Sequence, residues 1–148
     1  MLNRLQGVFA SFQSHNVRYV VIGGIAAVLH GVPRATFDLD ILIEPSIDNA
    51  RRLLAALEAA SFGTATLTTP EDLLAHEITV FNDRVRIDVQ TSTPGLVFQD
   101  AWVHRQEMTY NGQVFFVASL DDLIASKRAA ARTRDLEDVR LLEHRRAT

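Results

Sequence analysis

Two kinds of apolar spacing alternate along the chain, and each predicts a different element. Apolar residues three or four apart predict amphipathic helices, while short apolar or alternating runs predict strands. Gly, Pro and Asn between these runs predict turns, and Asn111-Gly112 is the strongest hairpin signal. The spacing predicts helices over about 2–14, 24–30, 45–60 and 119–131 and from residue 135 onward, and strands over 18–22, 37–44, 77–82, 85–90, 105–109 and 113–117.

This order of elements predicts an α+β fold, in which a mixed β-sheet with flanking helices forms a single domain over residues 1–148. The chain is 47% hydrophobic, which is enough for a sizeable core, and its net charge of −3 argues against tight nonspecific nucleic-acid binding. It has no cysteine, which excludes disulfides and thiolate metal sites. No apolar run approaches a membrane span, and residues 2–14 lack a signal-peptide pattern. The sequence therefore predicts a cytoplasmic protein that does not enter a membrane.

Asp38 and Asp40 interrupt a predicted strand whose neighbouring positions are apolar. Strand alternation places both carboxylates on one face, where their charges repel each other. A divalent cation would remove that cost, and Mg²⁺ prefers such oxygen ligands. Asp88 has the same setting in the strand over 85–90, so three carboxylates could form a two-metal platform for phosphoryl transfer. The alternative is that these aspartates form the solvated side of amphipathic strands.

Gly23-Gly24 lies between the apolar strand over 18–22 and a predicted helix. Such a turn leaves backbone N–H groups free at the start of the helix, where a phosphate is favoured. The alternative is a close-packed turn without a ligand. The turn is neither a Walker A loop nor a complete G-x-G-x-x-G motif.

Three stretches carry a family resemblance when they are taken together: GGIAAVLHGVPRATFDLDILIE, RIDVQTS and SLDDLIASKRAAARTRDLEDVRLL. They resemble the polymerase-beta-like nucleotidyltransferase superfamily, and most closely its small bacterial toxin-type members, the AbiEii group. The resemblance runs from about residue 18 to residue 143. It implies an Mg²⁺-dependent enzyme that moves a nucleoside monophosphate from an NTP to a hydroxyl of RNA, tRNA or protein, with pyrophosphate as the leaving group. It also implies an antitoxin partner. Because 148 residues leave little room for a separate acceptor-binding domain, the acceptor is expected to bind on a partner or on the second subunit of a homodimer.

The resemblance gives roles to individual residues. Gly23 and Gly24 would contact the nucleotide phosphates. Asp38 and Asp40 would bind two Mg²⁺ ions. Asp88 would be the third carboxylate, which holds the catalytic metal and helps to deprotonate the attacking hydroxyl.

The loop between the turn and the aspartates adds further candidates. Many members of the superfamily carry Gly-Ser at the turn, with the hydroxyl on the phosphates, whereas this chain has Gly24. Thr36 or backbone amides would take over that contact. Arg34 could hold the triphosphate, and its alternatives are a surface position or a salt bridge to Asp38.

The C-terminal helices supply the last candidates. Lys127 and Asp135 match a lysine and an aspartate that complete the nucleotide site in toxin-like relatives. Their alternatives are a solvated helix face for Lys127 and the N-cap of the last helix for Asp135. A basic cluster of Arg128, Arg132 and Arg134 would contact phosphates or an RNA acceptor, or else be solvated surface.

A second class of function is compatible with the same residues. The chain could be a nucleotide-binding or partner-interaction module that keeps the fold without turnover, or a purely structural subunit. Gly24 in place of Ser favours the inactive module, while retention of all three candidate aspartates favours the enzyme. His30 is interpreted as structural because a histidine at the end of a helix can bond the last carbonyls of that helix. His76 is interpreted as structural because it has no second ligand at metal-binding spacing.

Overall fold

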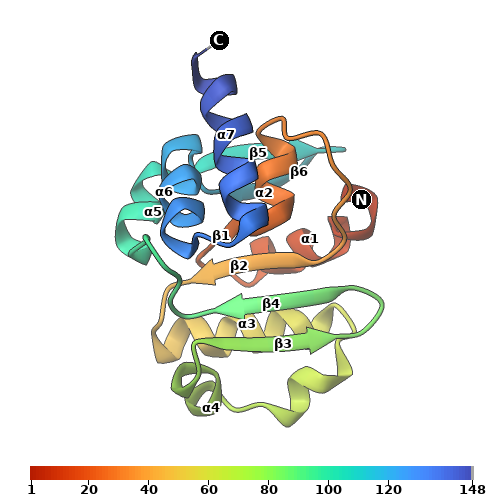
Figure 1. Ribbon diagram of the computed structural model, residues 1–148. Coiled ribbons are helices and arrows are strands. Elements are labelled where there is room, and N and C mark those ends of the chain that lie inside the picture. The colour runs from red at the N-terminus through yellow and green to blue at the C-terminus, as the bar shows by residue number, and fades with distance from the viewer. Residues whose placement is uncertain (148) are drawn as a thin grey trace.

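A computed structural model describes residues 1–147 as a six-stranded mixed sheet covered by helices (Figure 1). The strand order is β3-β4-β2-β1-β6-β5. The central pair β1 and β2 is antiparallel, β4 and β6 join it in parallel, and β3 and β5 close the edges as antiparallel hairpin strands. This confirms the predicted α+β fold. The strands are β1 (Tyr19–Ile22), β2 (Leu39–Ile43), β3 (Ile78–Asn82), β4 (Arg86–Gln90), β5 (Gln106–Tyr110) and β6 (Gln113–Val117).

The long predicted helices are present with small shifts at their ends, and the structure adds shorter helices. The helix predicted over 2–14 begins with a 3₁₀ turn. The pattern gave no sign of α4 or α5, because each has fewer than two full helical turns of apolar spacing. The helices are α1 (Gln6–Ser14), α2 (Gly23–Leu29), α3 (Ile47–Ala59), α4 (Pro70–Ala75), α5 (Phe98–His104), α6 (Leu120–Ala130) and α7 (Thr133–Ala147), with 3₁₀ turns at Leu2–Arg4 and Gly63–Leu67.

Local sequence signals explain where several elements begin. Ser46 caps α3 by accepting a hydrogen bond from the backbone N–H of Asn49 at 3.2 Å. Ser119 caps α6 in the same way, with the N–H of Asp122 at 3.1 Å. The β5–β6 hairpin turns at Asn111-Gly112, whose φ angles are 49° and 79°, as a tight primed turn requires.

The two faces of the sheet pack against different groups of apolar side chains. One face packs its apolar residues, including Leu39, Ile41 and Ile87, into the main core beneath α1 and α3. The other face carries a small apolar cluster, including Leu42, against α5. Figure 1 shows α6 and α7 in front of the sheet and α1 and α3 behind it. The alternation of β2 therefore turns Asp40 away from the main core, as predicted.

The start of α7 corrects one prediction. Asp135 was expected to be the N-cap of the last helix, but α7 begins two residues earlier, at Thr133. The Asp135 carboxylate instead reaches back to accept the backbone N–H of Arg132 at 3.3 Å. This is the reciprocal half of a capping box, which an acidic residue in the first turn provides. Within residues 1–147, no helix has the length and apolar character needed to span a membrane.

Candidate active site

One cleft of about 770 Å³ is lined by all the predicted catalytic, metal-binding and nucleotide-binding residues. The strands β2 and β4 and the turn into α2 contribute one part of its wall, and α6, α7 and the loop before β2 contribute the other. Residues far apart in the chain therefore share one surface. The predicted residues that line it are Gly23, Gly24, Arg34, Thr36, Asp38, Asp40, Asp88, Lys127 and Asp135.

Two carboxylates face each other on the sheet side of the cleft. Asp40 of β2 and Asp88 of β4 are register partners on adjacent parallel strands, so their side chains leave the same face. The pKa of Asp40 is raised to about 7, first by burial and then by the charge and hydrogen bond of Asp88 and the charge of Asp38, while Lys127 acts in the opposite direction. The pair therefore holds a proton near neutral pH when no cation is present.

Asp38 lines the same cleft but is more exposed than this pair. Asp38 precedes β2 and is exposed, and Asp88 is held by Arg86 of its own strand, with Nε 2.8 Å from Oδ1 and Nη2 3.3 Å from Oδ2. In the part of the chain that the structure describes, no three His, Asp or Glu side chains are already grouped to hold a metal ion. Asp40 and Asp88 nevertheless fit a hard divalent cation, because both offer only carboxylate oxygens and a cation would relieve their repulsion.

Gly23 makes room for one of these carboxylates. It has a φ of +71°, and a Cβ at this position would lie 2.3 Å from Oδ2 of Asp40. Both the backbone conformation and the space therefore require glycine. Because Gly23 has no side chain, the Asp40 carboxylate can lie directly against the start of α2.

Gly24 makes room for two other predicted residues. A Cβ at position 24 would lie 2.8 Å from Oγ1 of Thr36 and 3.3 Å from Nη2 of Arg34. The Thr36 hydroxyl thus occupies the space beside the turn into which a side chain at position 24 would project. The loop before β2 is folded back over the turn, which the sequence alone did not indicate.

A buried ion network forms the helical side of the cleft. The Lys127 side chain of α6 is 6% exposed, and its Nζ lies 2.9 Å from Asp138 and 3.7 Å from Asp135. Arg34 adds a two-pronged contact to Asp138, at 2.8 and 3.2 Å. Burial raises the pKa of Asp138, but the hydrogen bonds from Arg34 and Lys127 outweigh it and hold that pKa below its usual range. Lys127 is therefore not on a solvated helix face.

Sequence reasoning did not identify Asp138 as part of the site. It lies three residues after Asp135, so it shares a helix face with a residue that was identified. The two alternatives given for Arg34, a surface position and a salt bridge to Asp38, were wrong, because Arg34 and Asp138 bind each other.

The predicted basic cluster divides into two parts. Arg132 and Arg134 line the cleft, and Nε of Arg132 lies 2.7 Å from Asp135. Arg128 instead forms an ion pair with Glu143 on the surface. Only part of this cluster can therefore meet a ligand in the cleft.

The two histidines make structural hydrogen bonds, as their interpretation required. Nε2 of His30 lies 2.8 Å from the carbonyl oxygen of Ala118, which ties the end of α2 to the segment after β6. Nδ1 of His76 lies 2.8 Å from the carbonyl oxygen of Asp72 at the end of α4. Neither ring lines the cleft.

Comparison with known families identifies the kind of protein. Residues 3–143 match the family described as "Nucleotidyltransferase of unknown function (DUF6036)". The chain belongs to this family. No protein in the curated set matches it significantly.

The fold has a counterpart among solved structures. A crystal structure of a proposed nucleotidyltransferase from Thermotoga maritima superposes with a TM-score of 0.59. The match covers 97% of this chain and 90% of the other chain at 15% sequence identity. At this identity the likeness establishes a common fold and nothing finer.

Proposed function

We propose that this nucleotidyltransferase-family protein transfers a nucleoside monophosphate from an NTP to a hydroxyl acceptor and depends on a divalent cation, with Mg²⁺ as the expected ion. The observation that supports this proposal best is the pairing of Asp40 with Asp88. The strand register places their carboxylates opposite each other on adjacent strands, next to the glycine turn. Together with Asp38 at the rim, they are the proposed catalytic and metal-binding residues. A bound cation would neutralise charge on the triphosphate and on these carboxylates.

The cleft separates charge in a way that suits a triphosphate. Asp38, Asp40 and Asp88 occupy the sheet side. The other side carries the cations of Arg34, Lys127 and Arg132, together with the carboxylate of Asp135. We infer that the nucleotide lies between them, with its phosphates against Gly23 and Gly24. The backbone N–H groups at the start of α2 and the Thr36 hydroxyl are the proposed donors.

Lys127 and Asp135 have a different proposed role within nucleotide binding. Asp138 and Asp135 form ion pairs with Lys127, which fix the position of its ammonium group. Lys127 is therefore proposed to act as a buried, fixed positive charge and not to move onto the phosphates. Asp135 in turn orients Arg132. Both residues position the cationic side of the cleft for the phosphates.

The proposed reaction is an in-line displacement. The acceptor hydroxyl oxygen forms a bond to the α-phosphorus, and the bond from that phosphorus to the oxygen bridging to the β-phosphate breaks. Pyrophosphate leaves with that bonding pair. The hydroxyl proton passes to the carboxylate of Asp88, the residue to which the sequence resemblance gives this step.

Several finer aspects stay predictions from sequence. They are the assignment to toxin-type members, an antitoxin partner, a homodimer, the cytoplasmic location and the choice of RNA or protein as acceptor. The alternative of a nucleotide-binding module without turnover has one observation in its favour, since Arg86 already holds Asp88.

Calorimetry with each NTP and Mg²⁺ tests the proposal. Wild type should bind an NTP only with the cation present, and Asp40→Asn should abolish this binding. Asp48→Asn is the matched control, because Asp48 lies in α3 with its side chain 79% exposed. Transfer of label from α-³²P-NTP to added RNA or protein, with release of pyrophosphate, then separates the enzyme from the inactive module. A well-folded wild type that binds no NTP contradicts the proposal.

A further inference from the structure

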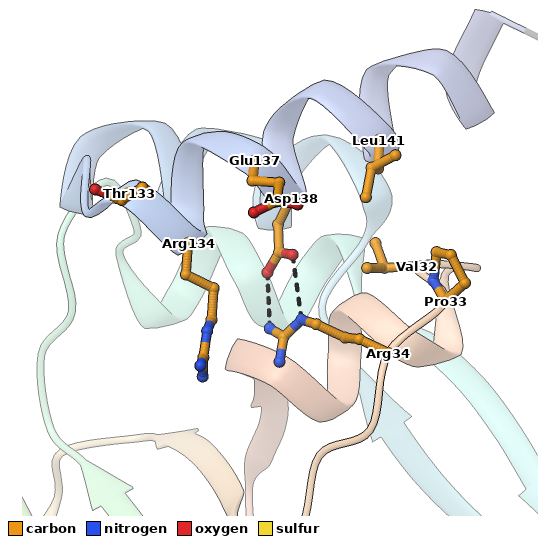
Figure 2. A pocket seen from close by; sticks show the side chains of 8 residues that line it. All are labelled: Val32, Pro33, Arg34, Thr133, Arg134, Glu137, Asp138 and Leu141. Atoms are coloured by element: carbon orange, nitrogen blue, oxygen red, sulfur yellow. Dashed lines mark hydrogen bonds and ion pairs between the residues drawn. The ribbon is translucent and has the colours of Figure 1, made fainter.

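A smaller pocket lies beside the cleft, between the segment after α2 and helix α7, and is called the side pocket here. Its volume is about 340 Å³. Apolar Val32, Pro33 and Leu141 and the charged Arg34, Arg134 and Asp138 line most of it (Figure 2). The side pocket is therefore apolar at one end and charged at the other.

Two arginines belong to both hollows. Arg34 and Arg134 line the side pocket and also the cleft. Arg34 uses Nε and Nη2 to bind Asp138, so its hydrogen bonds to that carboxylate leave Nη1 unused. Figure 2 shows Arg134 extending from the start of α7 on the same side as the Arg34 guanidinium. The two guanidinium groups therefore mark the junction between the hollows.

No carboxylate among residues 1–147 forms an ion pair with Arg134. Lys127 is paired with Asp138 and Asp135, and Arg132 is paired with Asp135. Within residues 1–147, Arg134 makes no hydrogen bond or ion pair although it lines the cleft. The Arg134 guanidinium has five N–H donors that no group in residues 1–147 uses, and the Nη1 group of Arg34 is left over from its contact with Asp138. Such donors are suited to bidentate contact with an anion of phosphate geometry.

We propose that Arg134, together with the Nη1 edge of Arg34, binds a phosphate group at the junction of the cleft and the side pocket. This inference rests on the proposed function, and it adds a contact beyond the glycine turn and the carboxylates. The phosphate has two chemical sources, which are the terminal phosphates of the NTP and the backbone of a nucleic-acid acceptor. No covalent step is involved, so the contact contributes affinity and position.

Binding measurements on Arg134 variants test this contact. The probes are each NTP with Mg²⁺, the corresponding nucleoside monophosphate, inorganic pyrophosphate, and a single-stranded oligoribonucleotide of about eight nucleotides. Arg134→Ala should fold normally, because Arg134 is exposed and unpaired within the described residues. Arg140→Ala is the matched control, since Arg140 lies on the same helix, is exposed and lines neither hollow.

Each result has a defined meaning. A loss of about tenfold in affinity for NTP and pyrophosphate, but not for the monophosphate, supports the contact and assigns it to the triphosphate. The same loss for the oligoribonucleotide alone supports the contact and assigns it to an acceptor. Arg134→Lys should recover part of either loss, because the charge is kept without the planar fork.

The inference is overturned if folded Arg134→Ala binds every probe as wild type does, or if Arg140→Ala weakens the same probe equally. Failure of the proposed function gives a different result. Wild type would then bind no NTP, while the pyrophosphate and oligoribonucleotide measurements would still report on the phosphate contact.

Discussion

The hydroxyl of Thr36 lies 2.8 Å from the position that a Cβ of residue 24 would take. The two positions therefore compete for one space beside the turn that opens α2. Many members of the superfamily that the sequence resembles carry a serine at this point of the turn. The structure offers a reason why this chain does not, because Thr36 reaches the same space from the loop before β2.

A reciprocal exchange tests this relationship. Gly24→Ser alone should lower NTP affinity by about tenfold, because overpacking against Thr36 costs about 1–3 kcal/mol. Thr36→Ala alone should give a smaller loss. The double variant Gly24→Ser/Thr36→Ala should bind more tightly than Gly24→Ser, as measured by calorimetry. If the two losses simply add, the hydroxyls do not share one role.

Gly23 provides a second test of the turn. Gly23→Ala should destabilise the protein by about 1–3 kcal/mol and weaken cation binding, because φ is +71° and the new Cβ would meet the Asp40 carboxylate. Gly7→Ala is the control. Gly7 lies in α1 with open space around its Cβ position, so this change should stabilise the helix by about 0.5–1 kcal/mol. Thermal unfolding and Mg²⁺ titration of both variants distinguish the two outcomes.

Much of the fold could be predicted because periodicity reports burial. The strands over 77–82 and 85–90 were found from simple alternation, and β3 and β4 match them within one residue at each end. Short elements escaped for the same reason. The helix α5 has seven residues, too few for a periodic signal against its neighbours. The equally short α2 was predicted only because glycine turns mark both of its ends. Its packing on the second face of the sheet depends on tertiary contacts that no local pattern contains.

The site was predictable by residue but not by contact. Strand alternation indicated where Asp40 and Asp88 point, and the family resemblance supplied Lys127 and Asp135; all four line the cleft. Pairings over long separations could not be read in this way. Arg34 and Asp138 are 104 residues apart, and only the docking of α7 beside the loop before β2 brings them together. The position of that loop over Gly24 is also a tertiary contact, which no local sequence pattern contains.

The buried carboxylate of Asp138 should be essential for stability. Asp138→Asn leaves Lys127 and Arg34 without their main partner, and breaking such a buried pair costs about 3–5 kcal/mol. Glu137→Gln is the control, because Glu137 is the exposed neighbour on α7. Chemical denaturation of both variants measures the difference. A cost below about 1 kcal/mol would show that the network is not held by this carboxylate.

The same contact predicts how the wild type responds to acid. The pKa of Asp138 is lower in the folded protein than in the unfolded chain. Its contribution is therefore complete above the unfolded value of about 4 and is lost as the pH falls through the folded value. Asp138→Asn should remove this acid-dependent loss, which unfolding measurements between about pH 2 and 5 would detect.

Asp40 should have the opposite effect on stability. Its pKa is about 7 in the folded protein and about 4 in the unfolded chain. Between these values the unfolded chain binds fewer protons, so stability falls as the pH rises from about 4 to 7. Asp40→Asn should abolish this fall. At pH 8 without divalent cations it should be more stable than wild type by about 1–4 kcal/mol.

Mg²⁺ should reverse this order. A cation that binds only the folded state raises the unfolding temperature of wild type, and more at pH 8 than at pH 5 because protons compete for Asp40. Asp40→Asn should show little response, while Asp48→Asn should behave as wild type because its carboxylate is exposed in α3. Thermal scans with EDTA or Mg²⁺ at both pH values check this. Equal pH slopes for wild type and Asp40→Asn would mean that Asp40 does not take up a proton near neutral pH in the folded protein.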